Sequence, residues 1–256
     1  KAGCVNTPVR VICSEKLAAR GEEDPGIDRT ITVTKPGRYD VRVSASPRDT
    51  GALDPYLKNP LSPVAISTSS SMTGDPATRA DALMDGDSRT SWIAGGDDED
   101  PTITAKFKQP TTISGLKISN RSDLNASSPL GLTVSGGGQP VTAYVNEKGE
   151  AKFDPITTDT LTIGFGATVP KRTLSRNGDP ERSLPVGITE LALIGAPATS
   201  VALAGDQQMT LPCGQGPAVS IDGRPAVQTS MSERVDDVLA GRPATAVPCG
   251  ATGGSV

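Results

Sequence analysis

The chain has 256 residues, enough for one large domain or two ordinary ones. Aromatic residues make up only 3%, while 28 residues are glycine and 22 are proline. This composition predicts a thin core of Val, Ile, Leu and Ala, with many turns and few long helices. The net charge is −4 without a long basic run, which excludes a typical nucleic-acid surface and a polybasic membrane patch.

Histidine is absent, which excludes serine and cysteine hydrolase sites that use histidine as the base, as well as histidine-liganded zinc. Gly136–Gly138 indicates a hairpin turn rather than a phosphate-binding loop. The dense acidic run Asp97–Asp100 is typical of a solvated loop tip. The residues therefore favour a non-catalytic binding chain, and a carboxylate-based catalytic fragment is the least favoured interpretation.

The four cysteines lie near the two ends of the chain and allow three pairings. We expect the local pairs Cys4–Cys13 and Cys213–Cys249, because each brackets a compact, strand-rich stretch. Disulfides would place the chain in an oxidising compartment, and four free thiols are the alternative. No run approaches the roughly 20 apolar residues of a membrane span. Because the chain begins at Lys1 without a visible signal peptide, we expect a piece of a longer precursor.

The first section carries strand patterns that end before a proline-rich stretch. In Arg38–Ser46, apolar and polar residues alternate, as in a half-buried strand. Lys35–Gly37 indicates the turn before it. We expect Pro47–Pro63 to be a linker. The strands predicted in this section are Val9–Cys13, Arg29–Thr34 and Arg38–Ser46.

A second series of short strands follows, interrupted by two long irregular segments, Met72–Asp100 and Ala167–Val186. Loops of that length in a compact domain are usually functional or organised by a metal ion. The predicted strands are Val64–Ser67, Thr102–Lys108, Thr112–Ser119, Leu132–Ser135, Pro140–Val145, Thr160–Phe165 and Ile188–Ile194.

The third section is predicted to contain three strands and one helix. The helix, Ser232–Ala240, has an apolar face, a capping serine at Ser230 or Ser232, and Gly241 at its end. Asp222-Gly223 indicates a hairpin turn between the last two strands. The predicted strands are Val201–Ala204, Ala218–Ile221 and Ala226–Thr229.

The outer sections are each small for an independent core. We therefore expect an all-β chain in which residues 61–197 form one sandwich, inserted into a smaller β-sandwich built from residues 1–60 and 198–256. Three consecutive modules are the alternative.

One turn carries most of the chemical information. Asp85 and Asp87 flank a glycine, and Thr90 adds a hydroxyl. Hard cations such as Ca²⁺ bind six to eight oxygens from carboxylates, hydroxyls and carbonyls. The turn supplies too few carboxylates alone, so a further one must come from elsewhere in the chain. A hydrogen-bonded turn without metal is the alternative.

This turn, read with Trp92, resembles the signature of discoidin (coagulation factor V/VIII C-type) domains and family 32 carbohydrate-binding modules. The strand pair Pro101–Lys108 and Thr112–Ser119 is similar to that of the family, with Ala105 and Leu116 departing from its pattern. Ile188–Gly195 is similar to its closing strand. The resemblance implies a discoidin-like, galactose-binding-like jelly roll.

The resemblance also implies a structural calcium ion and its ligands. The carboxylates would come from Asp85 and Glu190, and Thr90 would supply its hydroxyl. Trp92 would be a buried core residue beneath the turn. The full ligand set carried over is Ala82, Asp85, Asp87, Thr90, Thr189 and Glu190.

Modules of this family hold saccharides with loops at one end of the sandwich. The matching loops here, Asn120–Pro129 and Ala167–Pro185, contain no aromatic residue, so binding would depend on hydrogen bonds and charge. Solvated loops packed on a neighbouring domain are the alternative. The candidate glycan-binding residues are Arg121, Asn125, Arg172, Arg176 and Asn177.

The flanks, with Cys213-Gly-Gln-Gly-Pro and Asp237-Val-Leu-Ala-Gly-Arg-Pro, resemble the extracytoplasmic part of the actinobacterial cell-wall arabinofuranosyltransferase D family. This implies a non-catalytic glycan-recognition or scaffolding region of a membrane-embedded glycosyltransferase on the periplasmic side. Its partners would be a cell-envelope polysaccharide, arabinan-type or other, and the rest of the parent chain. The alternative is an adhesion module, or a carbohydrate-binding module of a secreted glycosidase.

Overall fold

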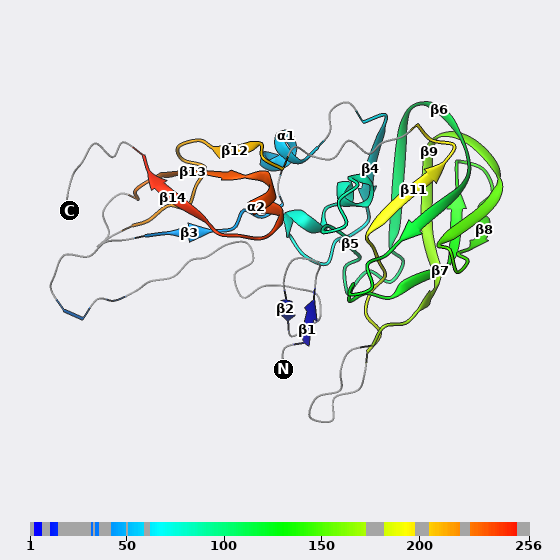
Figure 1. Ribbon diagram of the computed structural model, residues 1–256, viewed down its shortest axis with the longest axis horizontal. Helices are drawn as coiled ribbons and strands as arrows, with labels where there is room; N and C mark the ends of the chain where they lie inside the picture. Colours follow the sequence, from blue (N-terminus) through cyan, green and yellow to red (C-terminus); the bar gives the residue numbers. More distant parts are fainter. Residues whose placement is uncertain are drawn as a thin grey trace.

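The computed structural model describes residues 3–6, 11–14, 32, 34–35, 42–49, 51–58, 62–172, 182–197, 205–220 and 226–249. Residues 3–6 and 11–14 are described by their backbone alone. The described residues form a large β-sandwich and a smaller outer sheet that lie side by side (Figure 1). The larger unit lies between the two sequence segments that build the smaller one.

The central sandwich is built almost entirely from antiparallel strands. Its main sheet runs in the order β11-β6-β9-β7-β8, with β4 paired to β6, and a second ladder joins β5 to β10. The strands are β4 (Val64–Thr68), β5 (Trp92–Ile93), β6 (Thr102–Ser119), β7 (Ser128–Ser135), β8 (Val141–Tyr144), β9 (Glu150–Val169), β10 (Gly187–Ile188) and β11 (Glu190–Ile194).

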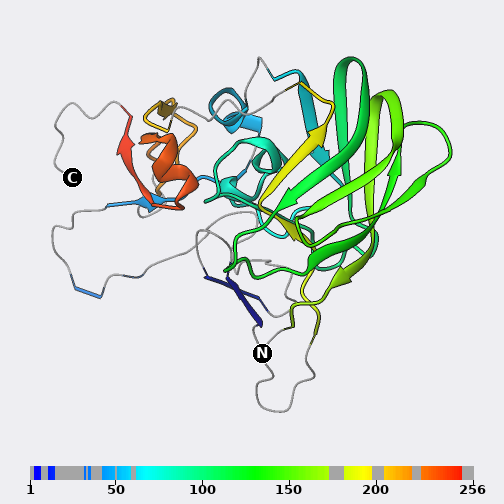
Figure 2. The same cartoon turned by 45° about the vertical axis from the view of Figure 1, so that its right-hand side comes forward.

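The two longest strands of this sandwich, β6 and β9, pair with each other along most of their length (Figure 2). The strands predicted at Thr102–Lys108 and Thr112–Ser119 form one continuous strand, β6. Instead of the expected turn between them, the pairing with β9 only shifts its register between Lys106 and Thr111. Such irregularities let a long strand bend and remain paired. Trp92 is fully buried and its ring centroid lies 5.9 Å from that of Phe165, which confirms its predicted core position.

The smaller sheet draws strands from both ends of the chain. Its order is β12 (Gln208–Leu211), β13 (Thr229–Arg234), β14 (Ala244–Pro248) and β3 (Ser44–Ala45). Strand β3 precedes the central sandwich and the other three follow it, so segments from both flanks share one sheet. The described residues show this four-stranded sheet, and the predicted smaller β-sandwich with its domain bounds stays a prediction. A disulfide joins Cys213 to Cys249, as predicted.

A two-stranded ribbon lies near the N-terminus. Strands β1 (Gly3–Asn6) and β2 (Val11–Ser14) are antiparallel, and their register places Cys4 opposite Cys13. The Cys4–Cys13 disulfide stays a prediction, because the side chains lie outside the described residues. The strand predicted at 201–204, the Asp222-Gly223 turn and most of the strand predicted at 29–34 also lie outside the described residues, so these three stay predictions. Within the described part, no helix is long and apolar enough to cross a membrane.

The predicted helix is shorter than expected. Helix α2 spans Val235–Leu239, whereas Ser230 and Ser232 lie in strand β13 and do not cap it. Ser232 pairs with Thr210 across the sheet, so strand pairing to a distant segment determines its conformation. The apolar face is as predicted, since Val235, Val238 and Leu239 are buried.

The interpretation of Pro47–Pro63 as a linker is wrong. This segment contains a 3-10 turn, η1 (Gly51–Leu53), and a short helix, α1 (Asp54–Leu57). Leu53 and Leu57 are 1% and 3% exposed and pack in one cluster with Met209 and α2. The four-residue spacing places both leucines on one side of the turn, so the segment is part of the outer core.

This packing predicts that Leu57→Ala lowers the free energy of unfolding of the outer unit by about 2–5 kcal/mol, because it leaves a cavity in the apolar cluster. Urea denaturation followed by circular dichroism measures the change. Val247→Ala is the matched control, since Val247 is 54% exposed on the outer sheet. Equal stabilities for the two variants would contradict a core role for α1.

Candidate functional site

The acidic turn follows two 3-10 segments, η2 (Pro76–Thr78) and η3 (Ala80–Met84). The Asp85 carboxylate accepts a hydrogen bond from the Asp87 backbone N–H at 2.8 Å, closing a local turn. Gly86 has a φ of 74°, a conformation that favours glycine. The Thr90 hydroxyl lies 2.8 Å from the second carboxylate oxygen of Asp85. The sequence therefore dictates a tight turn that is closed by hydrogen bonds to the Asp85 carboxylate.

A second carboxylate lies beside that of Asp85 and belongs to Glu190, the first residue of β11. Burial, together with the negative charge of Asp85, raises the pKa of Glu190 to about 7, against the lowering effect of a hydrogen bond from the Gly86 backbone. Burial likewise raises the pKa of Asp85 to about 6. The Oε1 atom of Glu190 is buried and has no hydrogen-bond partner within the described part of the chain. Two like charges are therefore held together in a partly desolvated place.

This arrangement fits a hard cation. A buried, unpartnered carboxylate oxygen beside a second carboxylate is stabilised when a cation lies between them. Among the described residues, no group of three or more acidic, cysteine or histidine side chains is placed so that it could hold a metal ion, so an ion at this turn would also need carbonyl and hydroxyl oxygens. The structure places the 82–90 turn and residues 189–190 together, with Ala82, Thr90 and Thr189 buried.

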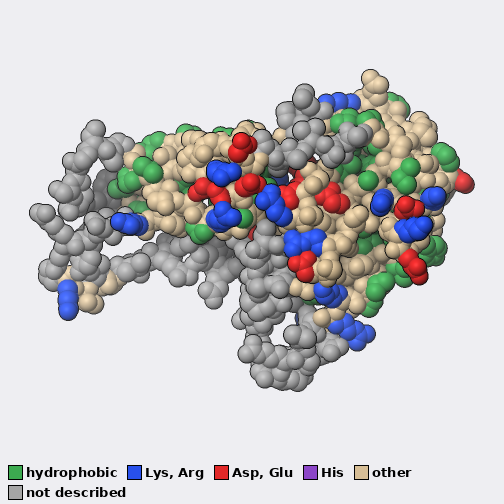
Figure 3. Space-filling model, viewed as in Figure 1, with side chains coloured by type: hydrophobic (Ala, Val, Ile, Leu, Met, Phe, Trp, Pro, Cys, Tyr) green, Lys and Arg blue, Asp and Glu red, His purple; other side chains and the backbone are tan. Residues whose placement is uncertain are grey.

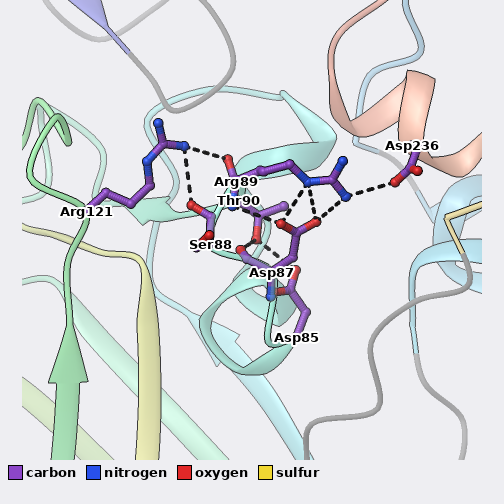
Figure 4. Close-up of polar contacts among 7 residues, drawn as sticks. All are labelled: Asp85, Asp87, Ser88, Arg89, Thr90, Arg121 and Asp236. Carbon is purple, nitrogen blue, oxygen red and sulfur yellow. Dashed lines mark hydrogen bonds and ion pairs between the residues drawn. The ribbon is translucent and has the colours of Figure 1, made fainter.

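Asp87 has a different partner from Asp85. The Arg89 guanidinium donates to both Asp87 oxygens, at 2.6–3.0 Å, and holds the pKa of that carboxyl below its usual value. The same guanidinium donates to Asp236 of α2 at 2.9 Å (Figure 4). Arg89 therefore bridges the acidic turn and the outer unit, across a cleft of about 240 Å³ that Gly205 and Leu239 also line.

A second ion-pair network joins the two units. The Arg79 side chain is 7% exposed and forms ion pairs with Asp49 at 2.9 Å, Asp54 at 2.7 Å and Asp81 at 3.3 Å. Ala77 packs in the apolar cluster of the outer unit nearby. Charged side chains of both signs accordingly gather where the units meet (Figure 3). Sequence reasoning missed this network, since only the folded chain brings Asp49 and Asp54 to Arg79.

Arg121, expected at an open glycan-binding end, is held by the protein itself. Its guanidinium pairs with Asp123 at 2.6 Å and donates to the carbonyls of Ser88 and Arg89 at 3.3 and 3.4 Å. These contacts brace the acidic turn from the side opposite Asp236 (Figure 4). The structure thus gives Arg121 a positioning role beside the turn.

Of the other candidate glycan residues, the structure describes two. Asn125 is half-buried in its loop. Arg172 is exposed, and its backbone forms an isolated antiparallel bridge with Ser183. Arg176 and Asn177 lie outside the described residues. A glycan-binding role for these four residues stays a prediction.

The carboxylate pair makes a specific prediction for protein stripped of divalent cations. In chelator, Glu190→Gln is expected to raise the melting temperature, because it removes one of two adjacent buried charges. Glu147→Gln, at an exposed turn, is the control with no expected effect. Scanning fluorimetry measures both, and a lower melting temperature for Glu190→Gln in chelator would contradict repulsion at this site.

Comparison with known proteins agrees with this architecture. The model of the third carbohydrate-binding module of arabinofuranosyltransferase D matches residues 62–205, more than half of the chain. Two curated α-(1→3)-arabinofuranosyltransferases are similar, from Mycolicibacterium smegmatis at 30% identity and Mycobacterium tuberculosis at 26%. Each match covers 97% of this chain and 18% of the relative, so the chain spans less than a fifth of their length.

A solved structure extends the likeness to the whole fold. The cryo-EM structure of arabinofuranosyltransferase AftD from mycobacteria matches with a TM-score of 0.66 and 23% sequence identity. The match covers 100% of this chain and 20% of that chain, so both the sandwich and the outer sheet have counterparts there. This chain belongs to the family of the third carbohydrate-binding module of arabinofuranosyltransferase D.

Proposed function

We propose that this chain is the non-catalytic glycan-recognition and scaffolding region of a cell-envelope arabinofuranosyltransferase. The family match carries the proposal, because the matched residues are a carbohydrate-binding module and the curated relatives share almost the whole chain. The absence of histidine agrees with a binding role. The partner would be an arabinan-type polysaccharide, met on the periplasmic side of a membrane in which the rest of the parent protein is embedded.

Calcium is the structural ion that we assign to the acidic turn. Asp85 and Glu190 would hold it through their carboxylates and Thr90 through its hydroxyl. The carbonyls of the turn and of Thr189 would complete the oxygen ligands. The ion would neutralise the buried pair and fix the turn relative to β11, without taking part in chemistry. The unpartnered Glu190 oxygen supports this assignment.

The junction between the units supports a scaffolding role. Arg79 and Arg89 each pair with carboxylates from both units, and Ala77 is fully buried among outer-unit residues. An interface of apolar packing and ion pairs, with the Arg79 side chain itself buried, resists rotation more than a flexible linker does. The module would therefore present bound glycan at a fixed place, and tethering to a catalytic region would raise the local concentration of acceptor.

The calcium assignment predicts that chelator lowers the melting temperature of the wild-type chain and that calcium restores it. Calcium at 100 times its dissociation constant would contribute about 2.7 kcal/mol to the free energy of unfolding. Magnesium should restore less, since it requires a smaller, octahedral site. Asp85→Asn and Glu190→Gln should abolish the response and Glu147→Gln should keep it. An identical response in all four proteins would contradict the assigned ligands.

Glycan recognition predicts that the chain is retarded in a native gel containing linear plant α-1,5-arabinan, relative to a gel without polysaccharide. Two or three hydrogen bonds to the sugar correspond to dissociation constants between about micromolar and millimolar. Bovine serum albumin in the same gels controls for sieving. Equal mobility in arabinan and in every other neutral envelope glycan tried would contradict a recognition role.

A further inference from the structure

Exposed apolar side chains gather on three adjacent strands at the far end of the sandwich. Tyr144 on β8 is 69% exposed, more than any other large apolar or aromatic side chain in the described part of the chain. Leu130 on β7 and Val169 on β9 are 42% and 56% exposed. In Figure 1, β8 lies at the end of the molecule away from the outer sheet, so the junction does not cover this surface.

The strand register places the side chains of Tyr144, Ala167 and Val169 on one face. Gly131 pairs with Tyr144 on one side and with Ala167 on the other. A methyl group at Gly131 would lie 3.7 Å from the Tyr144 ring and 3.2 Å from the Ala167 Cβ atom, so both side chains stand on the same side of the sheet. Val169, two residues beyond Ala167, faces the same way. The tyrosine ring therefore lies beside a glycine and next to a flat, open strip.

The strip around the ring is uncharged and carries hydroxyls. Thr133 and Thr142 form the next cross-strand pair on this face, and both are exposed. Gly164 pairs with Thr133 on the other side. We name this surface the tyrosine platform, and its residues are Gly131, Thr133, Thr142, Tyr144, Gly164 and Ala167.

A polysaccharide fits the platform better than a protein partner does. A stable protein interface needs about 800 Å² from each side and is anchored by several large side chains. The platform has one ring, with glycines, an alanine and threonines around it. The weakly polar C–H face of a sugar packs against an aromatic ring, while its hydroxyls bond to neighbouring hydroxyls. The lack of charge favours a neutral ligand.

We propose that the tyrosine platform is the glycan-binding subsite of this module and that it takes an uncharged furanoside polymer. This inference rests on the proposed recognition function and locates it on the face of β7, β8 and β9. The sugar ring would stack on Tyr144, with Thr133 and Thr142 as hydrogen-bonding partners. The platform supplies the aromatic surface that the two end loops lack.

The test uses the whole chain and linear plant α-1,5-arabinan in affinity gel electrophoresis. Tyr144→Ala is expected to weaken binding about tenfold or more, because the stacking surface is lost. Tyr144→Phe is expected to keep most of the affinity, since the ring remains. Val247→Ala is the matched control, because Val247 is similarly exposed on the outer sheet. Because the Tyr144 side chain is largely exposed, all melting temperatures should remain close to that of the wild type.

Nuclear magnetic resonance adds a positional readout. Titration with arabinan oligosaccharides should shift the amide signals of Gly131, Tyr144 and Ala167 before those of the outer sheet. Wild-type binding that persists in Tyr144→Ala would overturn the platform and leave the recognition function standing. An unretarded wild type would overturn recognition itself. Tighter binding of anionic polygalacturonate than of arabinan would overturn the neutral ligand class.

Discussion

The structure depends on one electrostatic constraint, the meeting of Asp85 and Glu190. These residues are far apart in sequence, and the closing strand β11 brings them together in a partly buried place. Two adjacent carboxylates there oppose folding when both are charged. The Thr90 hydroxyl donates to Asp85, and the Gly86 backbone N–H donates to Glu190. The Oε1 atom of Glu190 has no partner within the described part of the chain. The calcium ion that we propose here would remove this cost and fix the turn against the sheet.

The short segment from Asp75 to Trp92 links the parts of the molecule. Its 3-10 turns bring Ala77 into the core of the outer unit and Arg79 into a network with Asp49 and Asp54. Ten residues after Arg79, Arg89 reaches Asp236 from the acidic turn itself. The segment ends at Trp92, in the centre of the sandwich. The proposed cation site, the core packing and the docking of the outer unit therefore depend on one stretch of chain.

Features with local patterns were predictable from the sequence. The Asp-Gly-Asp turn, the buried Trp92 and the closing strand each have a pattern that the fold preserves. The insertion was expected from the small size of both flanks, and the pairing of β3 with β14 is what such an arrangement requires. The Cys213–Cys249 pair followed from local bracketing. In these cases neighbouring residues, or simple limits on core size, determine the outcome.

Features that depend on distant partners were not predictable. Ser232 adopts strand conformation because Thr210 pairs with it, and α1 is ordered because Leu57 meets a cluster formed mostly by the last section. Arg121 lies in a polar loop that the sequence suggests for ligand binding, and its guanidinium donates a hydrogen bond to the Ser88 carbonyl of the acidic turn. Tyr144 lies in the predicted strand Pro140–Val145, and only the register of the folded sheet places a glycine beside its ring. Tertiary pairing decided each of these outcomes.

Calcium titration of chelator-stripped protein in an isothermal calorimeter tests the central claim most directly. It measures whether calcium binds and how many ions bind per chain, and the Glu190→Gln variant tests the assigned ligand. The account predicts one calcium bound per chain in the wild type and no measurable heat of binding for Glu190→Gln. Absence of calcium binding to the wild-type chain would contradict it, as would binding that is unchanged in Glu190→Gln.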